Sequence, residues 1–146
     1  MSDGHQFATS SIAFLGNYLP RKCGIATFTH DLCEAVAIEA GEDSDVFTVA
    51  MNDVPEGYAY PPRVRFEIRQ NAQQDYLLAS EFLNINQVSA VCLQHEYCIF
   101  GGPFGVHLLN LLRRLRRPLV TTLHTVLQDP TDEQQKILEE IGRLSD

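Results

Sequence analysis

Short apolar runs alternate with stretches of helical periodicity along almost the whole chain, and this alternation restricts the possible folds more than any other feature. Apolar runs that end at Gly, Pro or polar residues predict strands, and apolar residues three and four positions apart predict helices. The predicted strands cover residues 11–16, 45–51, 63–68, 88–93 and 118–123. The predicted helices cover residues 25–40, 71–83, 104–116 and 132–143.

The order of these elements predicts an α/β domain with a parallel sheet covered by helices on both faces. A chain of 146 residues with 45% hydrophobic and 21% charged residues has room for one such domain. The strand at 63–68 alternates polar and apolar residues, which indicates a position near the edge of the sheet. The last residues follow a helix, where this pattern normally continues with a strand, so we expect residues 1–146 to form a single, incomplete domain. The alternative is an ordinary C-terminal helix, which fits the pattern as well.

Two helices begin with a capping pattern in the sequence. Asn71 is followed three residues later by Gln74, and Thr131 is followed at the same spacing by Gln134. A side-chain oxygen at the first of these positions can accept a hydrogen bond from the backbone of the second, which fixes the start of a helix. The sequence therefore predicts a capped start for both helices.

The charge of the chain excludes some partners. Eleven Lys and Arg residues stand against 19 Asp and Glu residues, a formal net charge of −8, so we expect no binding of nucleic acid by the surface as a whole. Arg113, Arg114, Arg116 and Arg117 form a local exception. The favoured interpretation is a solvated basic helix face, and contact with anionic lipid headgroups is the alternative.

The expected location is the cytoplasm. The polar start of the chain, residues 1–10, lacks the basic and apolar regions of a signal peptide, and the longest apolar runs are too short to cross a membrane. The four cysteines contain no Cys-x-x-Cys pair, which predicts reduced thiols.

Three loops of unusual composition follow predicted strands, at residues 17–29, 95–105 and 124–130. Ligands of open α/β sheets bind at the carboxyl ends of the strands, beside the switch in strand order. If the strand order is 3-2-1-4-5, these loops share one crevice, and we expect Gly24, His95 and His124 at its wall.

The first loop places Gly24 and Thr27 at the start of a helix, where free backbone N–H groups can hold a phosphate or sugar oxygen. The alternative is a glycine that only makes a turn. Neither GxGxxG nor GxxxxGK[ST] follows the first strand, which argues against a dinucleotide site or a P-loop.

The second and third loops offer titratable groups. His95, Glu96 and Tyr97 precede a glycine-rich exit, which suits a ligand loop, although the glycines could equally relieve backbone strain while His95 bonds to the main chain. His124 follows a strand directly and is a candidate general base or ligand group, with an interior histidine as the alternative.

Metal and thiol chemistry are weaker alternatives. His95, Glu96, Cys98 and His124 could gather around zinc, but neither an HExxH nor a Cys-x-x-Cys spacing favours this. A Cys–His nucleophile pair that uses Cys23 or Cys98 has no supporting pattern either.

Taken in order, three segments resemble retaining glycosyltransferases of family 4. Residues 12–28 (IAFLGNYLPRKCGIATF) are similar to the opening strand, glycine-containing loop and helix of that family. His95-Glu96-Tyr97 with Gly101-Gly102 resembles its loop after the fourth strand, and Thr122-Leu123-His124-Thr125 resembles its strand-end segment. The resemblance covers nearly the whole chain, although Cys98 stands where many relatives carry Gly.

The resemblance implies one half of a GT-B fold, which consists of two Rossmann-like domains. This chain would be the N-terminal, acceptor-side domain, and the C-terminal domain with its acidic donor motif has no counterpart here. It implies His124 as the catalytic residue, with Gly24, Thr27, His95, Glu96, Tyr97 and Thr125 in substrate binding.

The implied reaction moves a hexosyl group from a nucleotide-sugar, the substrate, to a sugar or other hydroxyl acceptor, with no cofactor or metal. The isolated chain would be inactive. The rival hypothesis is a non-catalytic α/β binding or interaction module derived from the same family.

Overall fold

The structure is a computed structural model that describes residues 10–146, so the predicted absence of a signal peptide falls almost entirely outside the described residues. Five strands form the sheet, and they are β1 (Ser11–Gly16), β2 (Asp45–Asn52), β3 (Val64–Arg69), β4 (Ala90–His95) and β5 (Leu119–Leu123). The α-helices are α1 (Gly24–Ala40), α2 (Gln73–Ile85), α3 (Leu108–Leu112) and α4 (Asp132–Leu144). Two short 3₁₀ turns, η1 (Tyr97–Ile99) and η2 (Pro103–Gly105), lie between β4 and α3.

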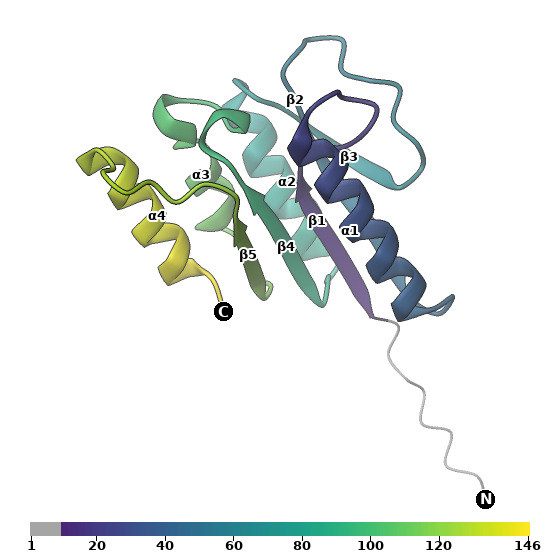
Figure 1. The fold of residues 1–146 in the computed structure, drawn as a ribbon. Helices are drawn as coiled ribbons and strands as arrows, with labels where there is room; N and C mark the ends of the chain where they lie inside the picture. Colours follow the sequence, from purple (N-terminus) through teal and green to yellow (C-terminus); the bar gives the residue numbers. More distant parts are fainter. Residues whose placement is uncertain (1–9) are drawn as a thin grey trace, which may run out of the picture.

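All five strands are parallel and lie in the order β3-β2-β1-β4-β5 (Figure 1). This confirms the predicted α/β, Rossmann-like sheet, its strand order and the edge position of β3. The first strand is central because the chain builds outward from it in both directions, first through β2 and β3 and then through β4 and β5.

Alternate residues of each strand face opposite sides of the sheet, and the two sides have separate cores. Ala13 and Leu15 of β1 face the larger core, which includes buried residues of α2, α3 and α4. Phe14 faces the smaller core, which α1 covers through Cys33. Helices therefore cover both faces, as predicted.

The predicted helix over 104–116 is wrong in its extent, because α3 covers only Leu108–Leu112. Phe104 and Gly105 have φ angles of 53° and 78°, in the left-handed region that a right-handed helix cannot contain. The chain therefore makes the short turn η2 first and enters α3 only after it.

The two predicted helix caps have different outcomes. Thr131 and Gln134 form the full capping box: the Gln134 N–H donates to the Thr131 hydroxyl at 3.2 Å, and the Thr131 N–H donates to the Gln134 side chain at 2.8 Å. The cap at Asn71 is wrong, since Ala72 occupies the cap position of α2 without a side-chain bond. There Asp75 accepts the Arg69 backbone N–H at 2.9 Å instead.

The remaining boundaries lie within two residues of the predictions, and the largest shifts are in α2, which ends at Ile85 rather than residue 83, and in β4, which ends at His95 rather than residue 93. The four cysteines are all free. Among residues 10–146, no helix has both the length and the apolar character needed to cross a membrane.

Candidate functional site

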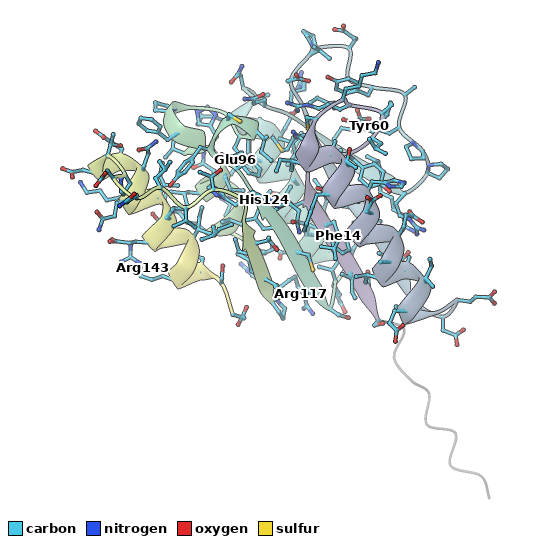
Figure 2. All side chains as sticks on the ribbon, viewed as in Figure 1. Phe14, Tyr60, Glu96, Arg117, His124 and Arg143 are labelled. Carbon is cyan, nitrogen blue, oxygen red and sulfur yellow. The ribbon has the colours of Figure 1, made fainter. Side chains whose placement is uncertain are left out.

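The loops after β1, β4 and β5 begin at one edge of the sheet, because β4 pairs with both other strands in parallel. A backbone hydrogen bond joins two of them, from the His124 N–H to the His95 carbonyl oxygen at 3.0 Å. Figure 2 shows Glu96 and His124 near each other at this end of the sheet. The structure therefore brings together the segments that the sequence predicted as neighbours.

His124 is held from two sides. Its Nε2 lies 3.0 Å from Oε1 of Gln94, a β4 side chain that is only 1% exposed. Its ring meets the Phe28 ring of α1 edge-on, with 4.7 Å between centroids. Because an amide oxygen only accepts hydrogen bonds, Nε2 is the donor in this contact, and in the neutral imidazole the other nitrogen, Nδ1, is an acceptor. No hydrogen-bond partner of Nδ1 lies within the described part of the chain, so this atom is available to a ligand.

Glu96 connects the loops after β4 and β5. One carboxylate oxygen accepts the Tyr97 backbone N–H at 2.8 Å and caps η1, and the other accepts the Thr125 hydroxyl. Both side chains are half-buried. Two residues expected to bind substrate, Glu96 and Thr125, therefore bind each other, and this contact fixes the backbone that carries His124.

We had expected His95 at the wall of a crevice, but it lies below the surface. The last residue of β4 shares the face of Val91 and Leu93, and its side chain is fully buried. Its ring stacks on Phe100 and meets Tyr97 edge-on. Neither ring nitrogen has a hydrogen-bond partner, so the suggested bond to the main chain is also wrong. The hydroxyl of Tyr97 is likewise buried without a partner.

This environment predicts an acid-sensitive fold. Burial lowers the pKa of His95 to about 4, and the nearby His124 also lowers it while Glu96 opposes the shift. A histidine in the unfolded chain titrates near pH ~6.5, so the unfolded state binds more protons between these two values. We therefore expect the free energy of unfolding to fall by about 3 kcal/mol as the pH drops through this window.

Urea unfolding across this pH range measures the effect. The variant His95→Phe should lose most of the dependence, because it keeps an aromatic ring between its neighbours and removes the buried proton site. His30→Phe on α1 serves as the control and leaves His95 in place. An unchanged slope in His95→Phe would contradict the prediction.

The first loop presents the start of α1. Cys23 caps this helix, and its sulfur accepts the Ala26 N–H and the Asn17 side-chain amide, each at 3.3 Å. The exposed Thr27 directs its hydroxyl to the Cys23 carbonyl oxygen. Gly24, the first residue of the helix, has no positive φ, and a Cβ atom there would meet nothing within 4 Å. The turn therefore does not require a glycine at position 24, and the space beside it is open.

A cavity of about 260 Å³ lies at the same edge of the sheet, where β2 and β3 end. Its lining includes Asn52, Asp53, Arg69 and Gln70. Arg21 connects it to the first loop, because its guanidinium lies 3.4 Å from the Asp53 carboxylate and donates to the Asn17 side chain at 2.9 Å. Carboxylate and amide groups of this kind can hold hydroxyl groups by hydrogen bonds.

Sequence reasoning missed two residues of this site. Phe28 of α1 is 44% exposed and packs against His124, whereas the sequence pointed to Gly24 and Thr27 as the residues that this loop contributes. Gln94 lies between the predicted strand at 88–93 and the predicted ligand loop at 95–105, and neither prediction included it. Strand periodicity could have found Gln94. Alternate residues of a strand face the same side of the sheet, so Gln94 shares the side of Cys92, which α1 covers.

Comparisons with protein-family models, with curated proteins and with solved structures found no match. Within residues 10–146, no group of three or more His, Cys, Asp or Glu side chains gathers in a way that could hold a metal ion.

Proposed function

We propose that this domain binds the hydroxyl acceptor of a glycosyl transfer reaction, in the manner of the N-terminal half of a GT-B enzyme. The observation that carries the proposal is the free Nδ1 of His124, held at the carboxyl edge of the sheet by Gln94 and Phe28. A neutral imidazole nitrogen in this position can accept a hydrogen bond from a sugar hydroxyl. Supporting features are the open start of α1 at Gly24 and the polar cavity that Arg21 connects to the first loop.

In the proposed reaction the acceptor oxygen bonds to the anomeric carbon of a nucleotide-sugar, with retention of configuration. The bond from that carbon to the nucleotide phosphate breaks, and its electron pair leaves with the phosphate. The proton of the acceptor hydroxyl passes to the phosphate oxygen that leaves, and in this proposal His124 orients the hydroxyl through a hydrogen bond. A second domain would supply the nucleotide-sugar.

A non-catalytic binding module is the second candidate. It is favoured by the contact between Glu96 and Thr125, which occupies two side chains expected to meet substrate. The encoding gene separates the two hypotheses. A second α/β domain with an acidic donor motif beyond Asp146 would favour the enzyme, and a stop codon would favour the module.

The proposal predicts different responses to acceptor and donor. In nuclear magnetic resonance titrations with simple sugars such as methyl glycosides, amide signals of Gly24, His124 and Thr125 should shift, because the proposed acceptor site is on this domain. In calorimetry with a panel of UDP- and GDP-sugars, we expect no sub-micromolar binding, because the proposal assigns the donor site to another domain.

Two controls sharpen this experiment. His124→Ala should abolish the acceptor-induced shifts, and Lys22→Gln, in the same region but outside the proposed contacts, should leave them unchanged. Shifts that are absent for every sugar would contradict acceptor binding. Tight binding of a nucleotide-sugar would contradict the assignment of the donor site to another domain.

A further inference from the structure

The arginine-rich segment between α3 and β5 lies at the end of the sheet opposite the candidate site. It precedes Leu119, the first residue of β5, whereas His124 follows the last residue of that strand. Figure 2 shows Arg117 at the lower end of the sheet and Glu96 and His124 at the upper end. Four of the 11 Lys and Arg residues lie within positions 113–117, although the chain carries a net charge of −8.

A cavity of about 470 Å³ is lined by this segment and by the last turns of α2. Its lining consists of four residues of α2 and three arginines: Ser80, Glu81, Asn84, Ile85, Arg113, Arg114 and Arg116. The concave shape distinguishes it from a basic helix face that is simply exposed to solvent, which is how the sequence alone was interpreted.

Asn84 fixes the backbone that carries the arginines. Its amide nitrogen donates to the Arg114 carbonyl oxygen at 2.9 Å, and its amide oxygen accepts the Arg116 N–H at 2.8 Å. Since both backbone contacts come from a helix residue, the two guanidinium groups extend from a fixed frame. Less conformational freedom is then lost when a ligand binds.

The arginines divide into two that are engaged and two that are free. Arg113 forms a paired ion contact with Glu140 at 2.6 and 2.9 Å, and the Arg117 side chain donates to the Val88 carbonyl oxygen at 2.6 Å. Arg114 and Arg116 are exposed, and neither side chain forms a hydrogen bond or ion pair with any residue in 10–146. The Ser80 hydroxyl already donates to the Leu77 carbonyl oxygen, so the free donors of the cavity are mainly guanidinium groups.

We infer that this cavity binds a phosphate group through Arg114 and Arg116. Guanidinium groups form paired, charge-assisted hydrogen bonds with phosphate oxygens. Glu140 neutralises Arg113, and Glu81 is the one carboxylate in the cavity lining, so an excess of positive charge remains for an anion. The phosphate belongs to a soluble ester or to a lipid headgroup, and the 78% exposed Ile85 at the rim is compatible with both.

The test uses the 146-residue chain with two kinds of probe. Pyrophosphate and glycerol 3-phosphate are titrated while the amide signals of residues 113–117 are followed, and the chain is co-sedimented with phosphatidylcholine vesicles with and without phosphatidylglycerol. Binding of the soluble probes supports a free phosphate ester, and binding to the anionic vesicles alone supports a lipid headgroup. If neither probe binds, or if binding does not weaken with added salt, the inference is wrong.

Charge variants test the assignment to these residues. Arg114→Gln and Arg116→Gln should each weaken binding roughly tenfold or more, the scale of one lost charge-assisted contact. Glu81→Gln should strengthen binding, because it removes the opposing charge. Lys22→Gln removes one positive charge at the far end of the sheet and should have little effect. Equal losses in Lys22→Gln and Arg114→Gln would show a response to overall charge and overturn the inference.

Discussion

His124→Ala is expected to lower kcat by about 100-fold or more when the domain acts together with a nucleotide-sugar domain. The substitution removes a group of the proposed site that Gln94 and Phe28 hold in place and whose Nδ1 has no hydrogen-bond partner among the described residues. Its contacts to Gln94 and Phe28 lie at the end of a strand rather than in either core. The thermal melting of the domain should therefore change little. Steady-state kinetics beside a melting curve measures both effects.

A conservative variant separates chemistry from packing. His124→Gln can still donate to the Gln94 side chain, but it loses the imidazole Nδ1. If His124 acts on the substrate, the glutamine variant should be as slow as the alanine variant. Near-normal kcat in both variants would refute the role in catalysis, and a collapsed melting transition in His124→Ala would favour a histidine kept for packing.

Gly101→Ala is expected to destabilise the fold by about 3 kcal/mol or more. A Cβ atom at Gly101 would overlap the Gln70 carbonyl oxygen and approach Nδ1 of His107 to 2.8 Å. The backbone cannot move away easily, because the Gly101 N–H donates to the Tyr76 hydroxyl at 2.8 Å and that hydroxyl donates to Gln70 at 2.7 Å. Tyr76 is fully buried. Urea unfolding at neutral pH measures the loss.

Gly24→Ala is the matched control for this prediction. It makes the same chemical change at a position where a Cβ atom meets nothing within 4 Å, so the free energy of unfolding should stay within about 1 kcal/mol of the original value. Similar losses at the two positions would contradict the argument from close contact. The comparison also separates a glycine required by packing from one that the fold does not require.

The sequence was sufficient for the sheet because each strand and helix carries its own local pattern. Strand order followed from connection rules that apply to α/β domains in general. The capping box at Thr131 was predictable for the same reason, since both of its residues lie within one turn. The start of α3 was not predictable in this way. Phe104 fits the apolar pattern of the predicted helix over 104–116, but the left-handed backbone at Phe104 and Gly105 prevents a helix there.

The site was less predictable because it depends on small shifts and distant contacts. The predicted strand ended at residue 93, so His95 was assigned to a loop. The strand in fact continues for two more residues, which places His95 on the buried face that carries Val91 and Leu93. The Glu96–Thr125 contact joins residues 29 positions apart in the chain, and no local pattern marks it. Similarly, the two hydrogen bonds of the Asn84 side chain join α2 to the backbone of the segment after α3.

The central position of β1 has a consequence for how the chain is made. Synthesis delivers β1, β2 and β3 first, and these strands can pair as soon as they leave the ribosome. The other edge of β1 meets its partner only when Ala90–His95 has emerged. Until then an apolar strand has an open row of backbone hydrogen-bonding groups, the feature that recruits foreign strands. During synthesis, the edge of β1 that later pairs with β4 is therefore the part of the sheet most open to pairing with another chain.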